Sequence, residues 1–514
     1  MNDTAHALGS SRTLWELVAR RADLTPHRPV LLQGDRALSF GELRDRAERV
    51  AAGLYDRGVR PGTVVAWQLP TRIETALLSF ALARLGAVQS PVIPFYRDRE
   101  VGFALRESRA EFFAVPGEWR GFDHTAMARR LGAKGVFEAY DRLPDGDPSV
   151  LPAPPSDGTS VRWIYWTSGT TSDPKGVLHT DRSLIAGGSC LAHALHLSAD
   201  DVGSMAFPYA HIAGPDYTVM LLLYGFPAVL FEQFALPAAL EDYRRHGVTV
   251  AGGSTAFYSM FLTEQRKQPE EPLIPTLRLL AGGGAPKPPE VYHTVVREMK
   301  VQLTHGYGMT EVPMITMGSP DDSVENLATT EGRPPQGMEI RIVDGEVRLR
   351  GEAVCQGYLD PTQTAEAFDA DGFLITGDVG HLTGSGHLVL TGRLKDVIIR
   401  KGENISAKEI EDLLHRHPAV GDAAVIGLPD AERGERVCAV IEMAEQPPGA
   451  DELTRTDELT LTGITSYLRT EGLSVHKLPE QLEVVDALPR NETLRKVLKY
   501  KLRERYSQGI TQAP

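Results

Sequence analysis

The sequence has few cysteines, no long hydrophobic run and no excess of basic residues, and each absence excludes a class of protein. Its three cysteines lie far apart, with no C-x-x-C pair, so we expect neither a disulfide framework nor a zinc site and assign the thiols to buried packing. The longest apolar stretch, 217–231, is shorter than a membrane span and is interrupted by Gly225 and Pro227. A formal net charge of −14 argues against a protein that binds nucleic acid through general attraction to phosphate.

The start of the chain also lacks the basic region and apolar core of a secretory signal, so we expect a cytoplasmic protein with no transmembrane segment. A G-x-S-x-G pattern is missing as well, which argues against a serine hydrolase. What is present is the composition of an ordinary globular protein, with 42% hydrophobic and 24% charged residues. Because 514 residues exceed what one core usually supports, we expect at least two structural units; the sequence leaves a monomer and a homodimer both open.

Helical and strand-like patterns alternate along most of the chain, which predicts a mostly parallel sheet flanked by helices. Residues 38–58 have apolar positions at helical spacing, 64–70 is typical of a buried strand, and the next helix is predicted to end at Gly86. A second alternating block covers 181–317.

The remainder of the chain has a different pattern. Residues 338–359 alternate with period two around Asp344–Gly345, which predicts a hairpin in a small, mainly antiparallel sheet. Beyond about residue 392, short strands mix with two predicted helices, at 407–417 and 494–506. This last part is therefore expected to form a separate α+β unit.

Residues 165–180, YWTSGTTSDPKGVLHT, combine hydroxyls, glycines and one lysine, a mixture that favours phosphate binding. The spacing of Gly169 and Lys175 is that of the G-x-x-x-x-G-K-[ST] phosphate loop. Two positions disagree with that pattern, because Pro174 replaces the second glycine and Gly176 replaces the Ser or Thr that would hold magnesium. The segment is either a phosphate loop of another kind or a solvated polar turn. Its candidate phosphate ligands are Thr167, Ser168, Gly169, Thr170, Thr171 and Lys175.

Four more segments follow this loop in a fixed order. They are HGYGMTE at 305–311, GFLITGDVG at 372–380, LTGRLKDVIIRKGENIS at 390–406 and LPRNETLRKVLK at 488–499. Together with the loop, they resemble the motifs of the acyl-adenylate-forming enzymes, which include acyl-CoA synthetases, firefly luciferase and the adenylation domains of peptide synthetases. The resemblance covers almost the whole chain.

The resemblance implies an α/β fold with a large N-terminal domain, 1–394, made of two helix-flanked sheets and a small distorted β-barrel-like sheet. A small mobile α+β domain, 395–514, follows and carries the catalytic lysine. ATP, Mg²⁺ and coenzyme A are the implied cofactor and co-substrates, and a small-molecule carboxylic acid is the implied partner.

The segment HGYGMTE begins like the dinucleotide fingerprint G-x-G-x-x-G but has Glu311 in place of the last glycine. A hydroxyl beside a carboxylate suits another task, in which Thr310 bonds a phosphate oxygen and Glu311 holds magnesium. The family assigns these roles to the matching positions, with Gly306, Tyr307 and Gly308 in the nucleotide site. An ordinary turn is the alternative.

Asp378 and Arg393 resemble the ribose ligands of the family, since a carboxylate accepts hydrogen bonds from ribose hydroxyls and a guanidinium donates to them. Taken singly, each is equally compatible with a surface salt bridge. The family places adenine beside a glycine-rich segment, for which a turn between a strand and a helix is the alternative. The matching residues here are Gly283, Gly284, Ala285 and Pro286.

The closing motif of the family carries the lysine that bridges the substrate carboxylate and the α-phosphate of ATP. Lys496 is our choice and Lys499 the reserve, because Arg495 stands where the family usually has glycine and the stretch is one residue longer. We expect Lys496 on a helix, opposite its apolar face, so a solvated basic face is the alternative. Lys395 matches the hinge of the family, and Gly402 lies where the family commonly has two glycines.

Two further segments resemble those that line the acyl pocket of the family. His211 lies near the carboxylate end of that pocket, unless it is a structural histidine. The apolar character of the pocket favours a fatty, alicyclic or aryl acid. The neighbours on which this rests are Ile212, Phe257, Tyr258 and Met314.

The resemblance predicts an ATP-dependent acyl-CoA ligase, which forms an acyl-adenylate, releases pyrophosphate and then transfers the acyl group to coenzyme A with release of AMP. An adenylating enzyme that loads an acyl carrier protein is the near alternative. The chain ends soon after Lys496 with no fused carrier domain, which favours free coenzyme A. A nucleotide-binding regulator with an inactive site is the alternative from another class.

Overall fold

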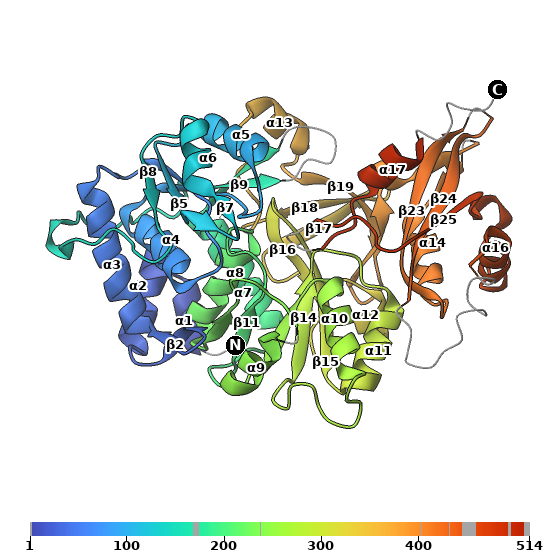
Figure 1. Cartoon of the computed structure of the whole chain (residues 1–514), viewed down its shortest axis with the longest axis horizontal. Coiled ribbons are helices and arrows are strands. Elements are labelled where there is room, and N and C mark those ends of the chain that lie inside the picture. Colours follow the sequence, from blue (N-terminus) through green and yellow to red (C-terminus); the bar gives the residue numbers. More distant parts are fainter. Residues whose placement is uncertain are drawn as a thin grey trace.

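The computed structural model describes residues 3–167, 174–236, 238–401, 403–430, 432–444, 459–491 and 495–507. The chain runs from helices and sheets at the left of Figure 1 to a C-terminal unit at the right. As the sequence predicts, the fold is α/β: large helix-flanked sheets come first, then a small antiparallel sheet, then a small α+β unit.

The first large sheet has six strands and is parallel except at one edge, where β10 runs antiparallel to β9. In spatial order, its strands are β10 (Lys175–Thr180), β9 (Val161–Thr167), β4 (Val88–Pro91), β3 (Val64–Trp67), β5 (Phe112–Val115) and β8 (Val136–Glu138). The residues that flank the Ser/Thr/Gly segment, Thr167 at the end of β9 and Lys175 at the start of β10, therefore lie at the edge of the sheet.

The second large sheet consists of two four-stranded sheets that meet edge to edge. The amides of Thr249 and Val250, at the start of β13, donate to the carbonyl of Val202, just before β11, at 2.9 and 3.1 Å. The first half contains β2 (Arg36–Ser39), β1 (Pro29–Gln33), β12 (Ala228–Leu230) and β11 (Gly203–Met205). The second half contains β13 (Val250–Gly253), β14 (Leu279–Gly283), β15 (Gln302–Met309) and β16 (Val312–Met317).

Three helices form the centre of the large region: α4 (Ile73–Leu85), α7 (Asp181–Ala194) and α8 (Ala213–Tyr224). Every residue of α4 is buried, as is typical of a helix packed on all sides, and α4 ends at Gly86 in the left-handed conformation, as predicted. Helices α7 and α8 touch closely, because a Cβ at Gly188 would lie only 2.6 Å from the Cβ of Val219.

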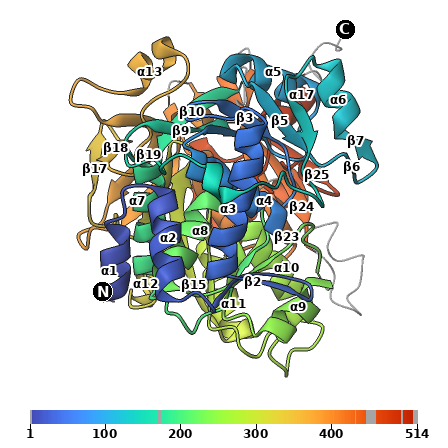
Figure 2. The same cartoon turned by 90° about the vertical axis from the view of Figure 1, so that its left-hand side faces the viewer.

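The other helices of this region lie around these sheets. Figure 2 shows α2 and α3 on the face nearest the viewer. The helices are α1 (Asp3–Gly9), α2 (Leu14–Leu24), α3 (Phe40–Asp56), α5 (Asp98–Ser108), α6 (His124–Arg130), α9 (Ala238–His246), α10 (Thr255–Gln265), α11 (Pro289–Met299), α12 (Val324–Thr329) and α13 (Pro361–Ala367). A short hairpin of β6 (Glu118–Trp119) and β7 (Phe122–Asp123) precedes α6.

The small antiparallel sheet contains the hairpin that the sequence predicts. Its two turn residues, Asp344 and Gly345, have φ values of 52° and 83°, the pair of positive values that a tight hairpin turn requires. The strands are β17 (Met338–Val343), β18 (Glu346–Gly351), β19 (Leu374–Leu382) and β20 (Leu388–Arg393).

The C-terminal unit is an α+β unit with its own apolar core. Its sheet is antiparallel apart from the last strand, which pairs in parallel with β24. The strands are β21 (Ile398–Arg400), β22 (Glu403–Ile405), β23 (Val420–Asp430), β24 (Gly434–Met443) and β25 (Gln481–Val485), and the helices are α14 (Ala407–Leu414), α16 (Leu461–Thr470) and α17 (Lys499–Ser507). The domain boundary between 394 and 395 stays a prediction.

One predicted helix is wrong in its first part. Helix α17 begins at Lys499, whereas the sequence pattern predicts a helix from residue 494. Arg495 has a φ of 58°, a left-handed conformation that a right-handed helix does not contain, and Val497 forms a β-bridge with Arg490. Lys496 therefore lies in a loop, and its predicted position opposite the apolar face of a helix is also wrong.

Two further predictions concern the cysteines and membrane-spanning helices. Cys355 and Cys438 are buried and Cys190 is partly buried; burial raises the pKa of all three thiols to about 12, which fits packing rather than catalysis. In the described parts of the chain, no helix has both the length and the apolar character needed to cross a membrane.

Candidate active site

A single cavity of about 2330 Å³ connects all the motifs. It lies between the ends of strands in the two large sheets, the small antiparallel sheet and the C-terminal unit. The candidate nucleotide-binding, catalytic and hinge residues that the structure describes line it: Thr167, Lys175, His211, Gly283, Gly284, Ala285, Pro286, Gly306, Tyr307, Gly308, Thr310, Glu311, Asp378, Arg393, Lys395 and Lys496. The other candidates lie outside the described residues: Ser168, Gly169, Thr170, Thr171 and Gly402.

The two ends of the Ser/Thr/Gly segment are held together by β-pairing. Thr167 and Lys175 are cross-strand partners, and the Lys175 amide donates to the Thr167 Oγ1 at 3.4 Å. The Lys175 ammonium lies 5.0 Å from the ring centroid of Tyr358, which places a cation at this edge of the cavity.

Tyr358 also connects Lys175 with the acidic candidate. Its hydroxyl donates to the Glu311 Oε1 at 2.8 Å, and burial followed by the charge of Glu311 raises the pKa of Tyr358, so the phenol keeps its proton. The sequence motifs do not identify Tyr358, because its partners Glu311 and Lys175 are distant in sequence.

Thr310 and Glu311 form the turn between β15 and β16, where Met309 pairs with Val312. His179 holds this turn, because its Nε2 lies 2.7 Å from the carbonyl oxygen of Thr310. Because burial lowers the pKa of His179 to about 4, the ring is neutral, and Nε2 carries the proton that is donated to this carbonyl.

Asp378 and Arg393 are brought together by strand register. They are cross-strand partners on β19 and β20, and Arg393 Nε lies 2.6 Å from Asp378 Oδ1. The Tyr307 hydroxyl donates to the other oxygen, Oδ2. Asp378 is only 2% exposed, so this is a buried carboxylate at the cavity wall rather than an isolated surface ion pair.

The glycine-rich segment lies at the end of β14, between β13 and β15. A Cβ at Gly282 would lie 2.1 Å from the carbonyl oxygen of Gly253, and one at Gly283 would lie 2.6 Å from that of Gly306. These glycines are therefore required by the close approach of neighbouring strands, a cause that the sequence pattern does not reveal. Gly284 follows with a φ of 80°, which is the conformation of a turn.

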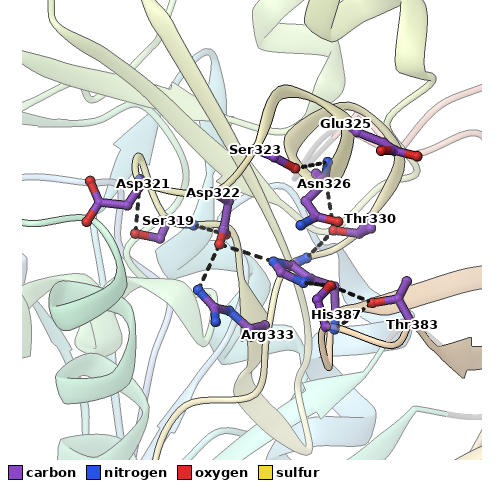
Figure 3. A network of polar contacts seen from close by, with 12 residues as sticks. Ser319, Asp321, Asp322, Ser323, Glu325, Asn326, Thr330, Arg333, Thr383 and His387 are labelled. Atoms are coloured by element: carbon purple, nitrogen blue, oxygen red, sulfur yellow. Dashed lines mark hydrogen bonds and ion pairs between the residues drawn. The ribbon is translucent and has the colours of Figure 1, made fainter.

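A polar network attaches the small antiparallel sheet to the second large sheet (Figure 3). Asp322, after β16, lies 2.8 Å from Arg333 Nη2 and 3.1 Å from His387 Nε2. A backbone hydrogen bond also joins the two sheets, because the Glu331 amide donates to the carbonyl of Leu388 at 2.8 Å. Because Leu388 begins β20, this network fixes the strand that carries Arg393.

Lys496 reaches the cavity from the loop before α17. Its amide donates to the Asn491 Oδ1 at 3.0 Å. The pKa of Lys496 is lowered to about 8, first by burial and next by Arg393, while Asp378 and Glu311 act in the opposite direction. The Lys496 charge also contributes, after burial, to lowering the pKa of His211 to about 3. Lys496 thus lines the same cavity as the candidate nucleotide residues Asp378 and Arg393 and the candidate acyl residue His211.

Lys499 has a different environment. Its ammonium lies 2.7 Å from the Glu411 carboxylate, within the C-terminal unit. Lys499, the reserve candidate, is therefore already paired within the C-terminal unit. Lys395 lies in a short 3₁₀ turn, Leu394–Asp396, between β20 and β21, and the next residue, Asp396, pairs with Arg503 at 2.8 Å.

The acyl side of the cavity agrees with the sequence only in part. His211 precedes α8 and accepts from the Ala213 amide at 3.2 Å through Nδ1, and Ile212 and Met314 line the cavity. Phe257 and Tyr258 do not line it, which corrects the prediction. Both lie on the face of α10 that packs in the core, while the opposite face presents Thr255, Ala256, Ser259, Met260 and Thr263 to the cavity.

Two family models match the chain, one in each structural region. The model described as AMP-binding enzyme matches residues 18–359, and the model described as AMP-binding enzyme C-terminal domain matches residues 409–494. The chain is 33% identical to the salicyl-AMP ligase / salicyl-S-ArCP synthetase of Mycobacterium tuberculosis, over 93% of this chain and 88% of that protein. It is 29% identical to the medium-chain fatty-acid–CoA ligase of Escherichia coli, over 92% of this chain and 87% of that protein.

Solved structures have the same architecture. The o-succinylbenzoate CoA synthetase (MenE) of Bacillus subtilis, in complex with the acyl-adenylate intermediate OSB-AMP, has a TM-score of 0.81 at 27% identity and covers 96% of this chain and 98% of its own. ATP-bound MatB from Rhodopseudomonas palustris has a TM-score of 0.84 at 28% identity, with the same coverage. With a matching family model over most of its length and a fold shared along nearly the whole chain, this protein belongs to the AMP-binding enzymes.

Proposed function

We propose that the chain is an ATP-dependent acyl-CoA ligase that activates a hydrophobic carboxylic acid as its acyl-adenylate. The observation that carries the proposal is the position of Lys496. Although it lies far from Glu311, Asp378 and Arg393 in sequence, it lines the same cavity as these three side chains. A cation in one cavity with the candidate ribose ligands and the acidic turn can reduce the repulsion between the two anions that must react.

In the first half-reaction, an oxygen of the substrate carboxylate attacks the α-phosphorus of ATP. A P–O bond to the acid forms and the P–O bond to pyrophosphate breaks, which yields the acyl-adenylate. The obstacle is the repulsion between two anions. With a pKa of about 8, Lys496 is mainly protonated at neutral pH and bridges the carboxylate and the α-phosphate, while Lys175 and the Ser/Thr/Gly segment stabilise the pyrophosphate.

Glu311 is the residue that would hold Mg²⁺. No cluster of three or more His, Cys, Asp or Glu side chains capable of metal binding occurs among the described residues. A single carboxylate fits Mg²⁺ all the same, because this ion usually takes one or two carboxylates together with waters and substrate phosphates. When bound, Mg²⁺ supplies positive charge to the phosphate oxygens. Tyr358 orients the carboxylate through its bond to Oε1.

In the second half-reaction, the thiolate of coenzyme A attacks the acyl carbonyl carbon. A C–S bond forms, the C–O bond to AMP breaks, and AMP leaves with that oxygen. The small C-terminal unit would turn about Lys395 between the two steps, so that one cavity serves both. Support for coenzyme A as the acceptor comes from relatives that are named CoA ligases.

The test is to measure pyrophosphate release from ATP across fatty, alicyclic, steroid-side-chain and aryl acids, with and without coenzyme A. Hydroxylamine added to the same reactions traps acyl-adenylate as a hydroxamate. Acid-dependent pyrophosphate release, with hydroxamate in the absence of coenzyme A and a thioester in its presence, is the expected result. Absence of hydroxamate with every acid would favour the alternative of a nucleotide-binding regulator.

A carrier protein is the second candidate for the acyl acceptor. The relative with 33% identity is named both an AMP ligase and an ArCP synthetase, which is the observation that favours this candidate. An acid that gives hydroxamate but no thioester with coenzyme A, and then acylates a phosphopantetheinylated carrier protein, would decide for it.

A further inference from the structure

The wall of the cavity near the glycine-rich segment carries a carboxyl group that the mechanism above does not use. Glu331, shortly after α12, lines the cavity, and its side chain keeps 9% of its surface exposed. One histidine connects it with the glycine-rich segment, because His305 Nε2 lies 3.7 Å from Glu331 Oε2 and 2.9 Å from the carbonyl oxygen of Ala285. Within the described residues, neither carboxyl oxygen of Glu331 accepts a hydrogen bond, and neither is fully buried.

His305 does not satisfy this carboxyl group. Burial, followed by the charge of Lys287, lowers the pKa of His305 to about 3, so the ring is neutral and carries a single N–H. The carbonyl of Ala285 can only accept, so Nε2 carries the proton and donates it to that oxygen. Nδ1 is then the acceptor that faces the Tyr258 hydroxyl at 3.3 Å. At 3.7 Å, Glu331 is beyond the reach of a hydrogen bond from Nε2.

The lysines that act on Glu331 are bonded to other groups. The Lys287 ammonium donates to the carbonyl of Ala328 at 2.6 Å, and the Lys408 ammonium on α14 lies 2.5 Å from the Asp412 carboxylate. Burial raises the pKa of Glu331, the charges of Lys287 and Lys408 act in the opposite direction, and Asp412 adds to the rise. Buried polar groups in proteins nearly always have a hydrogen-bond partner, from the protein, from water or from a ligand. A carboxyl group that faces the cavity is therefore suited to a donor that the ligand supplies.

We propose that Glu331 is a specificity-determining residue that accepts a hydrogen bond from the 6-amino group of the adenine base of ATP. The inference rests on the ATP-binding part of the proposed function, in which the base lies beside residues 283–286. A carboxyl group has an oxygen that accepts from an amino group whether it is ionised or protonated. The amino group at this position is also what distinguishes adenine from guanine and hypoxanthine, which have a carbonyl oxygen there. A carbonyl oxygen has no hydrogen to donate, so Glu331 would lose its amino partner.

A role in holding the C-terminal unit gives a different expectation. The cavity that Glu331 lines is also lined by Lys408 and Asp412 of α14, which belong to that unit. Loss of an electrostatic contact between the units would affect every nucleotide alike. Loss of an acceptor for the amino group affects only nucleotides that carry this group, so the preference between nucleotides separates the two roles.

The experiment measures the Kd of three Mg²⁺-nucleotides by isothermal titration calorimetry without any acid. They are ATP, purine riboside triphosphate, which has hydrogen at position 6, and ITP, which has a carbonyl oxygen there. The wild type should bind ATP about 10- to 100-fold more tightly than purine riboside triphosphate. Glu331→Leu should reduce this ratio by about tenfold, by weakening the binding of ATP alone. Glu331→Gln keeps an acceptor and gains an N–H donor, so it should retain the preference for ATP over purine riboside triphosphate and bind ITP more tightly than the wild type does.

Thr330→Val is the matched control. Thr330 is the neighbouring residue, is buried, donates to the carbonyl of Asn326 at 2.7 Å and does not line the cavity. This variant should keep the wild-type ratio between ATP and purine riboside triphosphate. Glu331→Met replaces the leucine variant if circular dichroism shows that the latter is unfolded.

Equal Kd values for ATP and purine riboside triphosphate in the wild type would overturn the inference, as would a folded Glu331→Leu protein that binds all three nucleotides equally less tightly. Acid-dependent pyrophosphate release combined with either result refutes this inference alone. A preference for ATP that depends on Glu331, without pyrophosphate release for any acid, supports this inference and refutes the proposed ligase function. Absence of ATP binding in the wild type refutes both.

Discussion

Replacing Lys496 by alanine should separate the two half-reactions. The substitution removes the only function that the mechanism gives to this side chain, which is to bridge the substrate carboxylate and the α-phosphate. It leaves the bonds of its backbone amide to Asn491 intact, so the loop should keep its position. Adenylate formation should therefore be lost, while thioester formation from preformed acyl-adenylate should persist.

The size of the loss follows from where the ammonium lies. Lys496 is in a cavity wall where burial and Arg393 lower its pKa, so its interactions with anions are screened less than in water. At an effective dielectric constant of about 20, two unit charges about 4 Å apart interact by about 4 kcal/mol. Since about 1.36 kcal/mol corresponds to a factor of ten in rate, adenylation should fall about 10³-fold.

The same pKa predicts a pH dependence. Lys496 loses its proton as the pH rises through about 8, so adenylation by the wild type should decline above that pH. Lys496→Arg keeps its charge at those pH values, so whatever activity it retains should not show this decline.

The assay measures hydroxamate formation from acid and ATP for the first step, and thioester formation from synthetic acyl-adenylate and coenzyme A for the second. Lys499→Ala is the matched control, because Lys499 pairs with Glu411 inside the C-terminal unit. An equal loss in both steps for Lys496→Ala, or the large loss appearing in Lys499→Ala instead, would refute the reasoning.

Three other substitutions test the surroundings of the site. Tyr358→Phe removes the donor to Glu311 and should lower adenylation about tenfold, with a higher Mg²⁺ requirement in a magnesium titration. Gly283→Ala puts a Cβ 2.6 Å from a backbone oxygen and should lower the free energy of unfolding by about 1–3 kcal/mol in urea denaturation. Asp216→Asn should be progressively more stable than the wild type as the pH rises from about 4 to 8: the folded pKa of Asp216 is raised to about 8, so the wild type loses stability over that window. A stability difference that does not change with pH would contradict this.

Local rules predicted the elements whose conformation is decided locally. The left-handed Gly86 ends α4, and the adjacent Asp344 and Gly345 make the tight turn of the β17–β18 hairpin. The described motif residues also meet in one cavity, since several stand at the ends of strands in the two large sheets, such as Thr167 on β9 and Gly283 on β14.

The features that the sequence did not predict depend on tertiary contacts. The apolar spacing around Lys496 is helical, but Arg495 adopts a left-handed conformation and the loop pairs with Arg490 instead. Tyr258 is apolar enough for either face of α10, and only packing decides that it points into the core. Tyr358 and Asp216 belong to no motif, because what distinguishes them is a distant partner in one case and the lack of a partner in the other.

The position of Lys496 also indicates which half-reaction this arrangement of the two units suits. Lys496 belongs to the C-terminal unit, and the Arg393 and Glu311 that act on its pKa belong to the preceding region. Any rotation about Lys395 would carry Lys496 away from these groups, because the two sets lie on opposite sides of that turn in the chain. We therefore expect this arrangement to be the adenylate-forming one, and we expect a cross-link that fixes it to permit hydroxamate formation and to prevent thioester formation. A cross-linked protein that makes thioester at the wild-type rate would show that no rotation is needed.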